Sequence, residues 1–240
     1  MYRVEDSHWW YAGMERITRA VLERWYRRGE GLRILDAGCG TGAAMTTYLA
    51  DYGSVTGFDL SAAALHFCRL RNAERLARAS AVQLPFASES FDLVTSFDVL
   101  YERAVPSDAQ ALREICRVLR PGGRLLLRLP AYDWLRSSHD EAVHTARRYT
   151  AAQVERMLCA NGFVIDRISY ANMFLFPLAV VVRITRRLSP GANGRSDLDS
   201  DPGILNGALG AVLSAEAPLV ARGRLPFGLS VVAVGQKAAT

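Results

Sequence analysis

The sequence predicts a doubly wound α/β domain, in which a mostly parallel sheet carries helices on both faces. Short apolar runs, each long enough for a strand, alternate with helical segments along most of the chain. The first run enters its helix through a glycine-rich loop at residues 38–42, which is typical of the opening strand of such a domain. A length of 240 residues, of which 50% are hydrophobic, suits one well-buried domain better than two.

Each element follows from a local pattern. Aromatic and aliphatic side chains recur at helical spacing over residues 6–28, and Thr150 is a suitable N-cap for a helix that ends before the Asn-Gly pair at 161–162. Strands are expected at residues 32–37, 54–59, 79–82, 91–96, 124–129, 163–169 and 229–235. The remaining helices are expected at residues 43–50, 62–72, 107–119, 150–160, 171–184 and 204–220.

The glycine-rich loop predicts a ligand site. Residues 34–42 read Ile-Leu-Asp-Ala-Gly-Cys-Gly-Thr-Gly, and glycines at alternate positions let the backbone approach a ligand where any Cβ would collide. Asp59 ends the second predicted strand, where a carboxylate can accept hydrogen bonds from both hydroxyls of a ribose. The pattern therefore indicates a bound nucleoside.

Two cofactor classes fit this loop, and Asp36 discriminates between them. The spacing of Gly38, Gly40 and Ala43 also fits the looser fingerprint of a dinucleotide-binding domain, so an NAD-dependent oxidoreductase is one alternative. A carboxylate at the end of the first strand would repel a pyrophosphate but attract a ligand that carries an ammonium and a sulfonium. Lys237 is the only lysine, so no Tyr-x3-Lys pair supports an oxidoreductase.

Four segments in order resemble the motifs of class I S-adenosylmethionine-dependent methyltransferases. They are ILDAGCGTG, GFDLS, LPF-x4-FDLV and LREICRVLRPGG, and the resemblance covers about residues 30–170. It implies a Rossmann-like seven-stranded sheet whose last strand is antiparallel, with the cofactor over the carboxyl ends of strands one to four. It also implies that Asp36 and the loop hold the methionine part, that Asp59 holds the ribose and that the end of strand three holds the adenine.

The resemblance assigns a set of cofactor-binding residues. They are Asp36, Ala37, Gly38, Cys39, Gly40, Gly42, Asp59, Leu60, Ser80, Ala81, Val82, Phe97 and Tyr11. Ser80 stands where the family commonly has an acidic residue, so the hydrogen bond to the adenine amine is expected to be weaker here.

The acceptor side is expected after strands four and five. Asp98 is a candidate for acceptor contact, with capping of a turn as the alternative. His139 with Asp140, or His144, is a candidate general base, unless the neighbouring arginines pair with the acids of this loop to hold it in place. Relatives often carry a histidine where Glu102 stands. The candidate substrate contacts are Trp10, Tyr101, Tyr132 and Tyr149.

Composition limits the partners. The net charge is +5, but the arginines are scattered between acids and apolar residues, which favours a solvated surface over a nucleic-acid site. The 4 cysteines form no CxxC pair, so no metal site is expected. The N-terminus lacks the pattern of a signal peptide and no run suits a membrane span, so we expect a cytoplasmic protein.

We divide the chain into a helical lid at residues 1–30 and a main domain at 31–240. The latter contains an apolar helical insertion and loop at about 171–225, before the last strand. Residues 171–187 are apolar and end in arginines, which fits the roof of a pocket, a homodimer interface or peripheral contact with a membrane. The oligomeric state is expected to be a monomer or a homodimer.

The sequence thus predicts an S-adenosylmethionine-dependent methyltransferase. Its acceptor is expected to be a small, partly apolar molecule, as in secondary-metabolite or lipid and saccharide tailoring, methylated on oxygen, nitrogen or carbon by in-line displacement. The alternatives are an NAD-dependent oxidoreductase and a non-catalytic binding protein with a methyltransferase fold.

Overall fold

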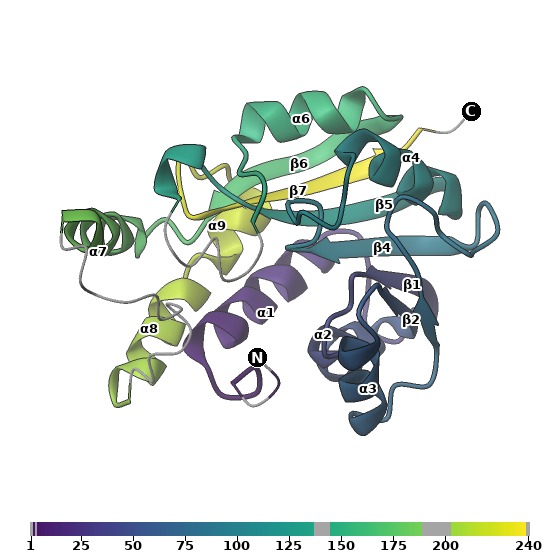
Figure 1. The fold of residues 1–240 in the computed structure, drawn as a ribbon, viewed down its shortest axis with the longest axis horizontal. Coiled ribbons are helices and arrows are strands. Elements are labelled where there is room, and N and C mark those ends of the chain that lie inside the picture. Colours follow the sequence, from purple (N-terminus) through teal and green to yellow (C-terminus); the bar gives the residue numbers. More distant parts are fainter. Residues whose placement is uncertain (1, 3, 137–144, 189–202, 239–240) are drawn as a thin grey trace.

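The computed structural model describes residues 2, 4–136, 145–188 and 203–238, and seven strands among them form one twisted sheet (Figure 1). The strand order is β3-β2-β1-β4-β5-β7-β6. Strands β1 to β5 are parallel, whereas β7 runs antiparallel to both β5 and β6. The strands are β1 Leu32–Ala37, β2 Gly53–Asp59, β3 Leu76–Arg78, β4 Phe91–Phe97, β5 Leu119–Pro130, β6 Phe163–Ala171 and β7 Ser230–Lys237. The predicted doubly wound sheet with an antiparallel last strand is confirmed.

One predicted strand was misplaced. The third strand lies at Leu76–Arg78 and not at residues 79–82. The strand β3 pairs only with β2, and the last residue of β2, Asp59, lies opposite Arg78. Because β2 offers no partner beyond Asp59, β3 ends at Arg78. Ser80 instead begins a turn that an isolated bridge to Gln83 closes. The adenine-side residues of the prediction therefore lie in a loop after β3.

Helices cover both faces of the sheet. Figure 1 shows α6 on one face and α1 and α9 on the other. Thr150 caps α6 through a reciprocal pair of hydrogen bonds with Gln153, so the predicted cap is confirmed. The helices are α1 Trp9–Leu22, α2 Ala43–Thr47, α3 Ala62–Leu70, α4 Asp108–Val118, α6 Ala151–Cys159, α7 Phe176–Leu188, α8 Leu205–Ser214 and α9 Ala217–Arg222, and the short 3-10 helices are η1 Leu49–Asp51 and η2 Asp133–Leu135.

The C-terminal helical region differs from the prediction in two ways. The helix expected over residues 204–220 is two helices, because Pro218 lies in the first turn of α9 and cannot continue a preceding helix. Between the two helices, the buried Glu216 carboxylate accepts a hydrogen bond from the backbone N–H of Phe174 at 2.7 Å. The helix expected over residues 171–184 begins only at Phe176, and Pro177 lies in its first turn, where proline needs no hydrogen-bond partner.

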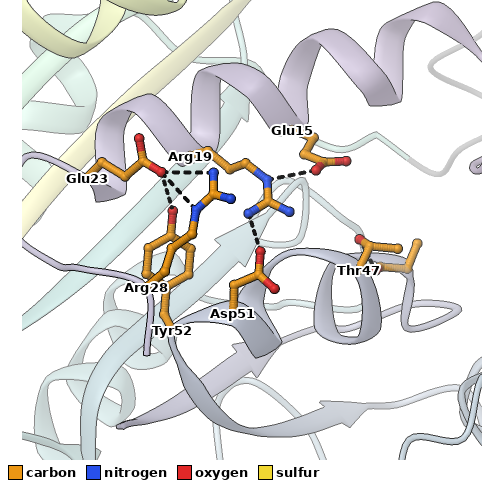
Figure 2. Close-up of polar contacts among 8 residues, drawn as sticks. Glu15, Arg19, Glu23, Arg28, Thr47, Asp51 and Tyr52 are labelled. Carbon is orange, nitrogen blue, oxygen red and sulfur yellow. Dashed lines mark hydrogen bonds and ion pairs between the residues drawn. The ribbon is translucent and has the colours of Figure 1, made fainter. Parts of the chain in front are cut away.

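The α1 helix belongs to the same hydrophobic core as the sheet. Ile17 and Val21 are buried against it. Figure 2 shows how its polar side is fixed: Arg19 donates to Glu15 at 2.8 Å and to Asp51 of η1 at 2.5 Å. The second half of α1 is thus held firmly, whereas its first turns reach the functional site. A separate lid at residues 1–30 stays a prediction.

Candidate functional site

A cavity of about 980 Å³ lies over the carboxyl ends of the parallel strands. The ends of β1, β2, β4 and β5 contribute Asp36, Asp59, Phe97 and Pro130 to its wall. In an open parallel sheet, ligands bind at this edge, where the strand order reverses on either side of the first strand. The predicted site residues that line the cavity are Trp10, Tyr11, Asp36, Gly38, Cys39, Gly40, Asp59, Leu60, Ser80, Ala81, Phe97, Asp98 and Tyr101.

The glycine-rich loop turns between β1 and α2 with left-handed backbone. Gly38 and Gly40 have φ angles of 71° and 55°, a region that side chains with a Cβ rarely adopt. A Cβ on Gly38 would approach the Val99 side chain to 2.4 Å, so this glycine is required by packing. A Cβ on Gly40 would meet no atom within 4 Å, although Gly40 lines the cavity. Its backbone is therefore open to a ligand.

Asp59 is held in place by two backbone groups. Its Oδ2 accepts a hydrogen bond from Gly40 N at 3.0 Å, and its Oδ1 accepts one from Ser61 N at 2.8 Å. A carboxylate has about four acceptor positions, so each oxygen keeps capacity for a further donor. The carboxylate can therefore accept hydrogen bonds from two neighbouring hydroxyl groups while it fixes the glycine-rich loop.

Asp36 is a buried acid at the end of β1. Its side chain accepts a hydrogen bond from Thr95 Oγ1 at 2.7 Å. The pKa of Asp36 is raised to about 6. Burial is the main cause and the nearby Asp59 adds to it, whereas the Thr95 hydrogen bond and the charge of Arg128 act in the opposite direction. A carboxylate under this desolvation penalty gains from a cation placed beside it.

Arg128 is a functional candidate that the sequence analysis missed. It lies on β5, is buried, and forms an ion pair with Asp98, Nη2 to Oδ2, at 2.7 Å. Its guanidinium lies 4.8 Å from the Trp10 ring centroid and 4.9 Å from that of Phe97. Burial alone would lower the pKa of Arg128, but Asp98 raises it above its ordinary value, so the side chain stays charged. The sequence did carry a signal for this residue, because Arg128 is the single charged residue in the otherwise apolar run of residues 125–129.

Asp98 occupies strained backbone next to that arginine. Its φ angle is 58°, and its N–H donates to the carbonyl oxygen of Arg128 at 3.0 Å. The carboxylate lines the cavity but is already engaged by the guanidinium. Its predicted role as an acceptor contact remains a prediction, because the ion pair gives it a structural role as well.

Glu102 is a second residue that was not singled out as a base. Its side chain lines the cavity, and the backbone around it is fixed by Arg147, which donates to the carbonyl oxygens of Leu100 and Val105. Burial, with a smaller contribution from the negative charges of Asp59 and Asp98, raises the pKa of Glu102 to about 7. Glu102 can therefore gain or lose a proton near neutral pH.

Several predicted residues lie elsewhere. Tyr149 donates a hydrogen bond to Asp108 at 2.9 Å, and Tyr132 stacks on Tyr170 with ring centroids 5.2 Å apart. His139, Asp140 and His144 lie outside the described residues, so their predicted role as a base is untested. The predicted residues that do not line the cavity are Ala37, Gly42, Val82, Tyr132 and Tyr149.

The far end of the cavity is mostly apolar. Its wall there comes from α7, α8 and the residues that precede α7 and β7, including Leu175, Val182, Leu209 and Leu229. Arg183 of α7 also lines the cavity. The segment predicted as roof, interface or membrane contact thus contributes to the cavity wall. None of the helices in the described ranges is both long and apolar enough to cross a bilayer.

Comparisons with known proteins agree with this geometry. Residues 35–127 match the model of a methyltransferase domain family. A demethylmenaquinone methyltransferase from Lactiplantibacillus plantarum is 41% identical over 103 residues, which cover 39% of this chain and 43% of that protein. A fatty-acid O-methyltransferase from Mycolicibacterium smegmatis is 34% identical over 158 residues, which cover 59% and 57% respectively. The chain spans about half the length of the curated relatives it matches.

A solved structure extends the likeness over nearly the whole chain. An S-adenosylmethionine-dependent methyltransferase from Methanosarcina mazei has a TM-score of 0.61 and 17% identity, and the match covers 92% of this chain and 98% of that one. The strand order and the cavity over the strand ends define a Rossmann-like methyltransferase fold. Residues 35–127 match a methyltransferase domain, and the fold is similar to that of an S-adenosylmethionine-dependent methyltransferase, so the predicted resemblance is confirmed.

Proposed function

We propose that this protein transfers a methyl group from S-adenosylmethionine to a small, partly apolar acceptor. The observation that carries the proposal is the division of one cavity into two chemically different halves. The half at the ends of β1 and β2 has the carboxylates Asp36 and Asp59. The half lined by α7 and α8 is mostly aliphatic, although Arg183 of α7 also lines it. A charged nucleoside cofactor fits the first half, and an apolar acceptor fits the second.

The residues of the first half match the groups of the cofactor. Asp59, fixed by Gly40 and Ser61, would accept from the ribose hydroxyls, and the open backbone of Gly40 would contact the nucleoside. Asp36 would offset the positive charge of the methionine part, which in turn would lower its raised pKa. When bound, the cofactor supplies an electrophilic methyl group.

The acceptor class follows from the second half of the cavity and from the relatives. Leu175 before α7, Val182 of α7 and Leu209 of α8 offer no polar group to a ligand, so they favour an acceptor with a hydrocarbon part. The relatives described above are named for menaquinone and fatty-acid methylation. A quinone-like or lipid-like acceptor is consistent with both observations.

Glu102 would take the proton from an acceptor that must lose one. Its carboxylate lines the same cavity and has a pKa of about 7, close to the working range of a general base. Burial raises the pKa of Tyr101, so the neighbouring phenol remains protonated and cannot serve as a general base. Glu102 is therefore the better candidate of the two.

The test is a cell extract supplied with S-adenosylmethionine that carries an isotopically labelled methyl group. We expect the purified protein to transfer label to a compound that partitions into organic solvent, and the Asp59→Ala variant to transfer none. Label that appears only on RNA would overturn the small-molecule acceptor. Binding of the cofactor without transfer to any fraction would indicate the non-catalytic binding protein, and reduction of NAD would indicate the oxidoreductase.

A further inference from the structure

The outward face of α7 is apolar where a surface helix normally carries charge. The exposed positions on this side are Phe174, Pro177, Leu178, Val181 and Thr185, which recur at helical spacing. Leu178 and Val181 are 57% and 58% exposed. A surface helix usually turns charged residues to solvent and apolar residues to the core. On the side that faces the cavity, α7 contributes Ala179 and Val182 along with Arg183, so most of the helix before Arg183 is apolar on both sides.

The neighbouring helix α8 continues this surface. Residues 204–215 contain no charged residue, although Leu205 is 59% exposed and Val212 is 38% exposed. Leu178 of α7 and Leu209 of α8 both line the cavity, and both helices lie at the same end of the molecule in Figure 1. Since Leu178 is also largely exposed, the cavity wall and the apolar surface meet at this side chain.

Aromatic side chains extend the surface at the base of α7. Phe176 contacts Trp134 and Phe227, with ring centroids 6.2 Å and 5.3 Å apart. Trp134 is 54% exposed and Phe227 is 39% exposed. Aromatic residues of this kind concentrate where proteins meet the boundary between lipid tails and water. We call the exposed residues of α7 and α8, with Trp134 and Phe227, the α7–α8 surface.

The charge distribution indicates what this surface meets. Residues 173–182 carry no charge, and Arg186 and Arg187 follow in the last turn of α7. Arg183 instead lines the cavity and donates to the carbonyl oxygen of Leu135 at 2.9 Å. The chain as a whole has a net charge of +5. An apolar stretch followed by arginines suits insertion among acyl chains with the cations at anionic headgroups. A second copy of this chain would bring like charges together at the same place.

We propose that the α7–α8 surface docks on an anionic lipid bilayer, so that an apolar acceptor can pass from the bilayer into the cavity past Leu178. The passage of an acceptor rests on the proposed function. The docking itself does not, because it depends only on the exposed apolar and aromatic side chains and on the arginines.

The docking is tested by sedimentation with vesicles. We expect the full chain to sediment with vesicles of phosphatidylcholine and phosphatidylglycerol, and more weakly with phosphatidylcholine alone. Val181→Asp should reduce the bound fraction at least about tenfold, since a carboxylate resists transfer into the acyl region. Val164→Asp is the matched control, because Val164 is 57% exposed on β6, and it should bind like the wild type.

Three results would overturn the docking: a wild-type protein that binds neither vesicle, equal binding by the two variants, or a dimer in light scattering that Val181→Asp dissociates. The last result would assign the surface to a second copy. Calorimetric titration with sinefungin, a stable analogue of S-adenosylmethionine, separates this proposal from the proposed function. Vesicle binding without binding of that analogue would contradict the function alone, and the reverse would contradict the docking alone.

Discussion

The two halves of the cavity are built in different ways. In the cofactor half, the Asp59 carboxylate accepts hydrogen bonds from backbone N–H groups of Gly40 and Ser61, and the Asp36 carboxylate accepts one from Thr95. In the proposed acceptor half, the walls from α7 and α8 are mostly aliphatic side chains, some of them exposed to solvent, and Arg183 is the charged residue that α7 contributes. Directional hydrogen bonds fix one ligand geometry, whereas apolar contacts tolerate many shapes. Under the proposed function, this difference predicts one fixed binding geometry for the cofactor and an acceptor that is selected mainly by its hydrocarbon content.

The largest expected effect on stability concerns Arg128, the buried arginine in the wall of the cavity. Arg128→Met should lower the free energy of unfolding by about 3–5 kcal/mol, because it leaves the Asp98 carboxylate without its cation in a buried place. Urea denaturation measures this. Arg224→Met is the control, and it should cost clearly less because Arg224 and its partner Glu155 are 61% and 45% exposed. Adding Asp98→Asn to Arg128→Met should restore part of the loss; no recovery would contradict the account of the pair.

A smaller effect is expected where α1 is fixed beside the cavity. Arg19→Ala should lower the free energy of unfolding by about 1 kcal/mol, because Arg19 is paired with both Glu15 and Asp51 and its side chain is only 19% exposed. Arg28→Ala, whose side chain is 58% exposed beside Glu23 in Figure 2, should change stability by less than about 0.5 kcal/mol. Equal losses in thermal unfolding would show that this anchor of α1 has no special strength.

The smallest effect concerns Glu102 and depends on pH. The pKa of Glu102 in the folded protein is raised from 4.5 to about 7, so the folded state holds a proton that the unfolded state has released. This contribution to stability is complete below pH 4.5 and is lost as the pH rises through about 7. Glu102→Gln should therefore melt about 2 °C above the wild type at pH 8. The difference should shrink at pH 5, and a constant difference would contradict the raised pKa.

Local signals explain how much of the fold was predictable. Thr150 and Gln153 form a cap that their own sequence spacing specifies, and the glycine-rich loop identifies its strand and helix. The third strand was misplaced because its C-terminal end is set by the point where β2 ends. This is a tertiary constraint, and the local sequence of residues 76–82 does not reveal it. Helices α8 and α9 were merged although Pro218, which lies in the first turn of α9 and cannot continue a preceding helix, was a local signal for the break.

The site was predictable to a similar extent. Asp36 and Asp59 lie at the C-terminal ends of recognisable strands, so the sequence predicted that both would lie at one edge of the sheet. Both line the cavity. Arg128 was missed because its partners, Asp98 and Trp10, come from other elements and only the fold brings them together. Tyr132 and Tyr149 are aromatic and close to strand β5, but the direction of each side chain depends on backbone geometry that composition does not reveal.

The most direct test of the central claim is the calorimetric titration of the wild type and of two aspartate variants with S-adenosylmethionine. We predict that the wild type binds it and that Asp59→Ala, folded by circular dichroism, binds at least about a hundredfold more weakly, because charge-assisted hydrogen bonds to the ribose are lost. Asp133→Ala, with a side chain that is 69% exposed outside the cavity, should bind like the wild type. Unchanged affinity in Asp59→Ala, or binding of NAD in place of S-adenosylmethionine, would contradict the account.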